Sequence, residues 1–213
     1  KIEDKTYKCY ASTIASFSPI ILSQINRNQF TYSFNYLKDP NGDFEQFIKL
    51  INGFEIDISI SNVPLLNEVS KILQVQPLIK ATDSFLNSIR KTPDNNLRLL
   101  ESYCNHGLQN VEINHEIISN WDSYKGLINI PNEGLLSLSV GSLETIISND
   151  QFLKTHQDTL FEIILKLIEE NGQQYSILFS YCDPSRLTSN QIFKLIEIVS
   201  FDSISPKIVN ALE

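Results

Sequence analysis

The sequence contains no methionine, and it has only 3 cysteines, 7 glycines and 1 tryptophan among its 213 residues. Basic residues are also sparse, because 17 lysines and arginines stand against 25 acidic residues and leave a formal net charge of -8. No window collects enough lysine and arginine to bind a phosphate backbone or an anionic membrane surface. No apolar run reaches the roughly 20 residues that span a bilayer. We therefore expect a soluble protein that binds neither nucleic acid nor membrane.

The cysteines Cys9, Cys104 and Cys182 are odd in number and cannot all pair with one another. No Asn-x-Ser/Thr acceptor for N-glycosylation occurs in the chain. Both features favour a reducing intracellular compartment, the cytoplasm or the nucleus. The chain begins at Lys1 in what reads as the end of a strand, without an initiator or a targeting segment. We therefore expect a fragment of a longer protein.

The first 90 residues mix extended and helical patterns within an ordinary globular composition of 42% hydrophobic and 20% charged residues. The alternation of Phe30, Tyr32, Phe34 and Tyr36 with polar residues predicts a half-buried strand. Similar patterns predict strands at residues 6–10 and 56–60. Apolar stripes at helical spacing predict helices at residues 12–26, 44–51, 62–75 and 77–89, with Asp43 capping the second of them.

The polar stretch from residue 90 to residue 96, which contains Pro93, is the expected domain boundary. Beyond it the strand patterns largely disappear, and helices are predicted at residues 97–105, 111–119, 140–148, 157–170, 175–181 and 188–200. Expected signals at helix ends are a Thr155 cap, a stop at Asn171-Gly172, and a capping box from Thr188 to Gln191. The stretch 121–133 is predicted to be an irregular connection. Residues 205–212 are predicted to be a helix that leads out of the second domain. The expected fold is α+β and mostly helical, with domains at residues 1–90 and 91–213.

The order of elements in the first 90 residues resembles the BTB/POZ domain, a protein-interaction fold in which a small sheet packs against helical hairpins. The family pattern for the second strand and its helix is matched in kind by Tyr7, Ile14, Ala15, Ser18 and Ile21, with Tyr10 where the family has histidine. A later family pattern is followed by Phe44, Phe47, Ile48, Ile51, Ile56 and Asn62-Val63, with Ile51-Asn52-Gly53 in place of Tyr-Thr-Gly. Residues 135–147 and 153–167 are similar to the helical BACK region that often follows a BTB domain.

The resemblance implies a non-enzymatic adaptor or scaffold that associates with itself or with other proteins and uses no cofactor. Family members often dimerise through a helix and a strand that would precede Lys1, so we expect dimerisation to be weakened here. Family members that hold a cullin scaffold carry an apolar-x-Glu motif after the second-strand helix. Residues 26–29 are Asn-Arg-Asn-Gln instead, so cullin binding, and with it the recruitment of substrates to a ubiquitin ligase, is an open and doubtful implication of the resemblance. The expected partner interface, which includes an exposed edge suited to strand addition, comprises Ile2, Tyr7, Tyr10, Phe17, Ile21, Asn26 and Arg27.

The sequence contains few residues or motifs that indicate catalysis. The histidines His106, His115 and His156 are the plausible general bases near neutral pH, and surface or capping roles are expected for them. A metal site from Cys104, His106 and His115 is a weaker alternative, because Cys-x-His spacing alone is a weak signal. No glycine-rich dinucleotide loop, phosphate-binding loop or Gly-x-Ser-x-Gly elbow occurs. We expect no catalytic residue, cofactor or metal.

A second interpretation is a self-contained helical scaffold whose groove binds a peptide helix. In that case the extended patterns near the start of the chain are incidental. The two interpretations differ in an observable feature, because a BTB fold requires strands near residues 7–10, 30–36 and 55–58.

Overall fold

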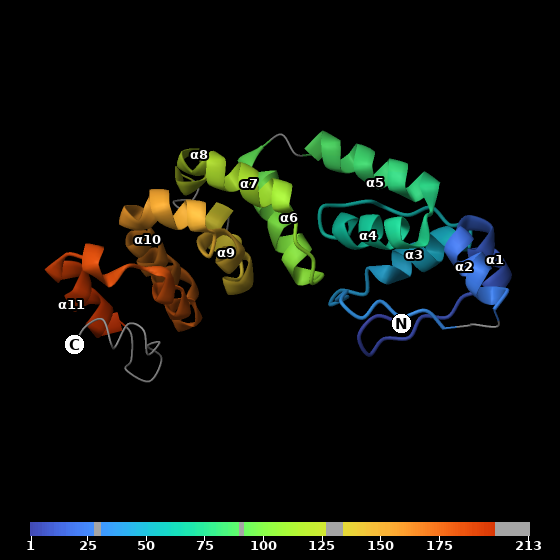
Figure 1. The fold of residues 1–213 in the computed structure, drawn as a ribbon, viewed down its shortest axis with the longest axis horizontal. Helices are drawn as coiled ribbons and strands as arrows, with labels where there is room; N and C mark the ends of the chain where they lie inside the picture. Colours follow the sequence, from blue (N-terminus) through green and yellow to red (C-terminus); the bar gives the residue numbers. More distant parts are fainter. Residues whose placement is uncertain (28–30, 90–91, 127–133, 199–213) are drawn as a thin grey trace. The chain divides into compact units, whose positions relative to one another are not determined.

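The computed structural model describes residues 1–27, 31–89, 92–126 and 134–198, and the described residues are mostly helical. The chain divides into two compact units, Lys1–Ile113 and Asn114–Glu213 (Figure 1). The division comes later than the boundary expected at residues 90 and 91. Helix α6 (Pro93–Asn105) packs against α4 (Val63–Leu73), and Ser102 Oγ donates a hydrogen bond of 2.7 Å to the Ser61 carbonyl. Pro93 starts α6 in the first turn, where proline is tolerated, and does not end a domain.

The single helix expected at residues 12–26 is two helices, α1 (Ala11–Phe17) and α2 (Pro19–Ile25). Ser18 separates them with an extended backbone, φ -126° and ψ 108°, because the residue before a proline avoids the helical region. Its buried hydroxyl accepts a hydrogen bond from the Ile21 amide at 3.2 Å and donates one to the Leu73 carbonyl at 2.6 Å. Ser18 therefore caps α2 and joins it to the end of α4.

Helices α3 (Phe44–Ile51), α4 and α5 (Gln76–Ile89) form the frame of the amino-terminal unit (Figure 1). Gln74 adopts the left-handed conformation, φ 57°, which ends α4 and lets α5 fold back against it. Asn67 Nδ2 donates to Thr82 Oγ1 and to Asp83 Oδ1 at 2.8 Å each, which fixes the register of these two helices. The core of this unit is formed mainly by Ile2, Phe34, Leu37, Phe44, Phe47, Ile51, Leu65, Leu66, Val69, Leu73 and Leu78.

The small sheet expected from the sequence is not present in the described residues. Residues 6–10, 31–33 and 54–59 form no ladder, and the strand pairings are two isolated bridges, Ile2 with Lys5 and Ile2 with Phe34. Phe30, at the start of one expected strand, lies outside the described residues. Alternating aromatic residues predict a buried face but do not supply a partner strand. Phe34, only 4% exposed, instead packs against Phe44 of α3.

The carboxyl-terminal unit is built around the long helix α10 (Asp150–Asn171). Around it lie α8 (Trp121–Lys125), η2 (Gly134–Ser137), α9 (Val140–Ile147), η3 (Gln173–Tyr181), η4 (Pro184–Arg186) and α11 (Ser189–Ile198), while α7 (Val111–Ser119) runs across the division between the units. Part of the stretch expected to be irregular is thus the short helix α8. The expected helix at residues 205–212 lies outside the described residues.

The ends of these helices follow the sequence signals in part. Helix α10 starts seven residues before the expected start and is capped by Asn149, so the prediction of a Thr155 cap is wrong. Its end at Asn171-Gly172 is confirmed, with Gly172 at φ 102°. The capping box is also confirmed, because the Thr188 amide donates to Gln191 Oε1 at 2.9 Å and the Gln191 amide donates to Thr188 Oγ1 at 3.4 Å. Across the described ranges, no helix combines the length and apolar character needed to cross a membrane.

Candidate protein-interaction groove

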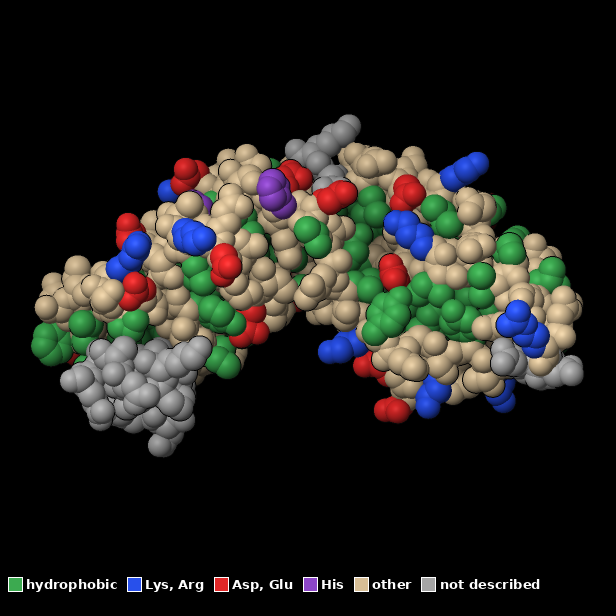
Figure 2. Space-filling model, viewed as in Figure 1, with side chains coloured by type: hydrophobic (Ala, Val, Ile, Leu, Met, Phe, Trp, Pro, Cys, Tyr) green, Lys and Arg blue, Asp and Glu red, His purple; other side chains and the backbone are tan. Residues whose placement is uncertain are grey.

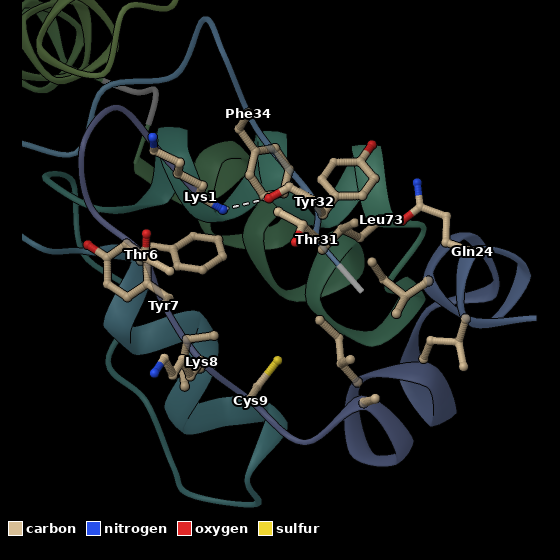
Figure 3. A pocket seen from close by; sticks show the side chains of 16 residues that line it. Lys1, Thr6, Tyr7, Lys8, Cys9, Gln24, Thr31, Tyr32, Phe34 and Leu73 are labelled. Carbon is tan, nitrogen blue, oxygen red and sulfur yellow. Dashed lines mark hydrogen bonds between the residues drawn. The ribbon is translucent and has the colours of Figure 1, made fainter. Parts of the chain in front are cut away.

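A groove of about 490 Å³ opens in the amino-terminal unit between segments that are distant in sequence. One wall is the extended segment 6–9, a second is the segment 31–34, and α1 and α2 supply a third (Figure 3). Phe44 and Ile48 of α3 and Leu73 of α4 close the floor. We call this hollow the amino-terminal groove.

The floor of the groove is apolar and rigid because it belongs to the core. Phe44 is 5% exposed, and its ring centroid lies 4.8 Å from that of Tyr7 and 5.8 Å from that of Phe34. Tyr32 extends this aromatic group, with its ring 4.9 Å from Phe34. Ile14 and Ile25 face the groove from α1 and α2 and are only partly buried. An apolar side chain placed here would exchange water for aromatic and aliphatic contacts.

The wall formed by residues 6–9 carries backbone groups that lack backbone partners. Within the described part of the chain, residues 6–9 make no backbone-to-backbone hydrogen bond. Thr6, Lys8 and Cys9 are exposed, and the segment is held in place through the Tyr7 hydroxyl, which donates to Asp39 Oδ2. An extended, exposed and unpaired segment is a template for an added strand.

The ionisable groups of the groove do not favour catalysis. Its described lining contains no histidine and no carboxylate, and its cations are at Lys1 and Lys8. Desolvation raises the pKa of the Cys9 thiol, so the thiolate nucleophile is disfavoured at neutral pH. Desolvation and the hydrogen bond to Asp39 raise the pKa of Tyr7.

The structure places the seven expected interface residues in different surroundings. Tyr7 and Ile21 line the amino-terminal groove. Tyr10 occupies the N-cap position of α1 without a side-chain cap hydrogen bond, and it is 77% exposed outside the groove lining. Asn26 and Arg27 are exposed after α2. Ile2 is fully buried in the core, so the expectation that it belongs to an exposed edge is wrong.

Phe17 belongs to a second hollow of about 370 Å³, formed by α1, α2 and the start of α5. It is lined by Ala15, Ser16, Phe17, Pro19, Leu22, Gln74, Gln76 and Pro77. Phe17 is 42% exposed and Leu22 is 48% exposed, so this hollow is open to solvent. Figure 2 shows a further concentration of hydrophobic side chains on the surface over α3 and α4. Exposed apolar surface of this kind is typical of proteins that bind other proteins.

Sequence reasoning did not identify the groove floor. Phe34 and Phe44 belong to apolar patterns of the sequence, but nothing in the linear pattern showed that their rings would face a hollow. The aromatic alternation from residue 30 was the available signal, and the buried face that it predicted is correct for Phe34. Tyr36, 55% exposed, instead donates its hydroxyl to Glu68 Oε1 at 2.7 Å.

The histidines were expected to have surface or capping roles, and the roles of His106 and His115 agree with this, although His106 is buried. His106 is fully buried at the end of α6, where it is the C-cap residue, while His115 is exposed. His156 lies beside Trp121 and Phe152, and desolvation lowers its pKa. In the described ranges, the one group of side chains that could hold a metal is Asp39, Asp43 and His106, and neither Cys104 nor His115 belongs to it.

A comparison of the chain with known protein families found no family model that matches it, and a comparison with curated proteins found no match.

Proposed function

We propose that the chain is a non-enzymatic protein-interaction module of the BTB-BACK type, acting inside the cell. Its amino-terminal groove binds an extended apolar segment of a partner polypeptide. The observation that supports this most directly is the unpaired extended wall at residues 6–9 beside the apolar floor formed by Phe44 and Leu73. The free thiols of the three cysteines fit a reducing compartment.

An extended ligand suits both features of the groove. Its backbone can hydrogen-bond to the wall at residues 6–9, while alternate side chains point to the floor. Each Val, Leu, Ile or Phe side chain that becomes buried contributes about 1.5–3 kcal/mol. Two or three such side chains contribute about 3–9 kcal/mol, and a few backbone hydrogen bonds add to this, but the cost of association offsets most of the gain. We therefore expect weak, reversible binding.

The family assignment rests on the order of the helices alone, because the described residues do not form the small sheet that a BTB fold requires. A Ser-Pro elbow between α1 and α2, the helix α3, the paired helices α4 and α5, and a following helical unit agree with the BTB-BACK order. Self-association is then a natural use of the groove, with the extended segment supplied by a second copy. Cullin recruitment is not included, because Asn26 and Arg27 after α2 lack the acidic residue of the cullin binders.

A non-enzymatic role agrees with the chemistry of the groove. The described lining offers thiol, phenol, hydroxyl, amide and ammonium groups but no imidazole or carboxylate to act as a general base. Desolvation raises the pKa of Cys9 and outweighs the opposing effect of the terminal ammonium group of Lys1.

A second candidate function is a helical scaffold that binds a peptide helix. It is favoured by the lack of a strand ladder in the described residues and by the second hollow beside Phe17 and Leu22. A helix can place apolar side chains from one face into such a hollow without any backbone hydrogen bond to the scaffold.

Peptide selection followed by calorimetric titration tests the proposal. Ten-residue peptides displayed on phage would be selected on the purified chain, and the best binders would be titrated against two variants of the wall, Lys8→Pro and Cys9→Pro. Each variant removes one amide hydrogen from a segment with no ladder to disrupt, so folding should persist. Neighbouring amides in a strand point in opposite directions, so one of the two variants removes a donor to the ligand.

The expected result is a loss of affinity of about 2- to 12-fold in one wall variant, the equivalent of one hydrogen bond of 0.5–1.5 kcal/mol. The matched control is Glu55→Pro, in another exposed non-helical segment, and it should leave the affinity unchanged. Helical peptides that bind both wall variants normally but lose affinity for Phe17→Glu would contradict the proposal and support the scaffold function.

A further inference from the structure

The side chains of Asp39, Asp43 and His106 meet at one point in the amino-terminal unit, although His106 lies more than sixty residues from the two carboxylates in sequence. One ligand atom from each lies within 4.8 Å of the others. Asp39 and His106 are fully buried, and the Asp43 side chain is 16% exposed. The cluster joins the turn before α3, the start of α3 and the end of α6.

The hydrogen bonds of His106 leave a conflict at its second nitrogen. His106 Nδ1 lies 2.8 Å from the Ser102 carbonyl, which can only accept, so Nδ1 carries the hydrogen. The neutral ring then has a lone pair at Nε2, and this atom lies 3.2 Å from Asp43 Oδ2. Two acceptors face each other at that distance only when a proton or a cation lies between them.

Asp39 supplies an independent sign that a ligand is missing. Its Oδ2 accepts hydrogen bonds from the Tyr7 hydroxyl and from the Phe44 amide, the latter at 3.4 Å. Its Oδ1 is buried and has no hydrogen-bond partner among the described residues. A buried carboxylate oxygen without a partner is costly, because it has lost water and gained nothing in exchange.

No lysine or arginine of the described residues forms an ion pair with either carboxylate. The ion pair recorded for Asp43 is with His106, and none is recorded for Asp39. Lys5 approaches this region, but its ammonium group donates to the Asp39 backbone carbonyl and not to the carboxylate. A cation bound between the carboxylates would therefore not displace a lysine or an arginine from an ion pair.

We propose that Asp39, Asp43 and His106 form a binding site for a first-row divalent cation, with zinc as the best fit. Imidazole nitrogen and carboxylate oxygen are common zinc ligands at about 2.0–2.2 Å, whereas magnesium and calcium prefer oxygen alone. Two ligands of a tetrahedral zinc ion lie about 3.3–3.4 Å apart, close to the 3.2 Å between His106 Nε2 and Asp43 Oδ2. Metal-binding histidines usually donate the hydrogen of one ring nitrogen to a carbonyl or carboxylate, which fixes the ring and leaves the other nitrogen for the metal. His106 has this arrangement, with Nδ1 on the Ser102 carbonyl and Nε2 toward the site.

A shift of the Asp39 carboxylate toward the other two ligands would bring it to the ion, and the partly exposed side at Asp43 leaves a position for water. The ion would hold the end of α6 to the start of α3. The Lys38 amide already donates to the His106 carbonyl at 2.9 Å across the same junction. The site is thus structural, and it adjoins the amino-terminal groove, because Tyr7 and Phe44 of the groove lining both donate to Asp39 Oδ2.

The test uses the full chain, stripped with a chelator and then titrated with zinc chloride. The expected results are one zinc per chain after gel filtration, measured by elemental analysis, and a saturable rise in the unfolding midpoint. Asp43→Asn keeps the shape of the side chain and removes its charge, so zinc affinity should fall at least about tenfold. The matched control is the exposed His115→Gln, which should leave the affinity unchanged.

Nuclear magnetic resonance of the imidazole nitrogens tests the site in the unmodified chain, so it does not depend on the folding of a variant. Zinc should shift the Nε2 signal of His106 while Nδ1 stays protonated. Two outcomes overturn the proposal. One is a His106 ring protonated on both nitrogens that zinc leaves unchanged, which identifies a buried ion pair with Asp43. The other is zinc binding of equal affinity in Asp43→Asn.

Discussion

Replacing Ser18 by alanine should destabilise the amino-terminal unit while leaving the carboxyl-terminal unit unaffected. The Ser18 hydroxyl is fully buried and serves two partners, the Ile21 amide and the Leu73 carbonyl. Loss of the N-cap of α2 costs about 0.5–2 kcal/mol. Leaving the Leu73 carbonyl without this donor costs about 1–3 kcal/mol more. We therefore expect the free energy of unfolding to fall by about 2–4 kcal/mol, within the 5–15 kcal/mol typical of a domain.

The sole tryptophan makes the assay specific for each unit. Trp121 is buried in the carboxyl-terminal unit, so its fluorescence follows unfolding of that unit alone. Far-ultraviolet circular dichroism follows the helices of both units. In urea, the Ser18→Ala change should lower the midpoint of the dichroism transition of the amino-terminal unit by roughly 1–2 M, for a typical dependence on denaturant. The fluorescence midpoint should not move.

The matched control for this prediction is Ser16→Ala, in the preceding helix. Ser16 is exposed, and its hydroxyl donates to the Thr13 carbonyl within α1. Its loss should change stability by no more than about 0.5 kcal/mol. Equal effects of the two substitutions would refute the role assigned to the Ser18 hydroxyl. A parallel shift of the fluorescence midpoint in Ser18→Ala would refute the independence of the two units.

Three further predictions concern the carboxyl-terminal unit. Gly172→Ala places a Cβ on a residue with φ 102°, only 2.9 Å from Gln174 Oε1, so the fluorescence midpoint should fall by the equivalent of about 1–3 kcal/mol. The control is Gly141→Ala within α9, where no atom lies within 4 Å of the new Cβ, and it should be neutral or stabilising. Thr188→Ala breaks the capping box, so amide hydrogen exchange in α11 should become faster. The free energy of opening measured from that exchange should fall by about 0.5–2 kcal/mol. Desolvation depresses the pKa of His156 in the folded state, so the neutral ring is favoured there. The unit should therefore lose stability as the pH falls below the unfolded value of about 6.5, and His156→Gln should weaken that dependence in fluorescence-monitored urea unfolding.

The helices were largely predictable because their signals are local. Apolar spacing fixed the existence of α3, α4, α5, α7 and α9 to within a few residues. Errors occurred where a local rule competed with another one. The apolar stripe from Ile14 to Ile25 indicated one helix, but Pro19 forces Ser18 out of the helical region and breaks it. Thr155 satisfied the rule for a cap, yet Asn149 comes earlier and caps a longer helix.

The groove and the polar cluster could not be predicted in the same way, because both depend on contacts between distant residues. Asp43 was correctly placed at the N-cap of α3, but its side chain makes no cap hydrogen bond and lies beside His106 instead. The Phe44 amide donates its hydrogen bond to Oδ2 of Asp39, five residues earlier. Aromatic alternation indicated an extended chain with a buried face, and only the tertiary structure shows that the buried face contacts α3 without forming a ladder. The metal site expected to be absent is proposed here on this tertiary geometry alone.

Hydrogen–deuterium exchange of the chain with and without a saturating selected peptide tests the central claim most directly. Residues 6–9 make no backbone hydrogen bond in the described structure, so their amides should exchange rapidly in the free chain. We predict that the peptide slows exchange at residues 6–9, and that this protection weakens in whichever of Lys8→Pro and Cys9→Pro loses affinity. Protection confined to the hollow around Phe17 and Leu22, with residues 6–9 unchanged, would contradict the account.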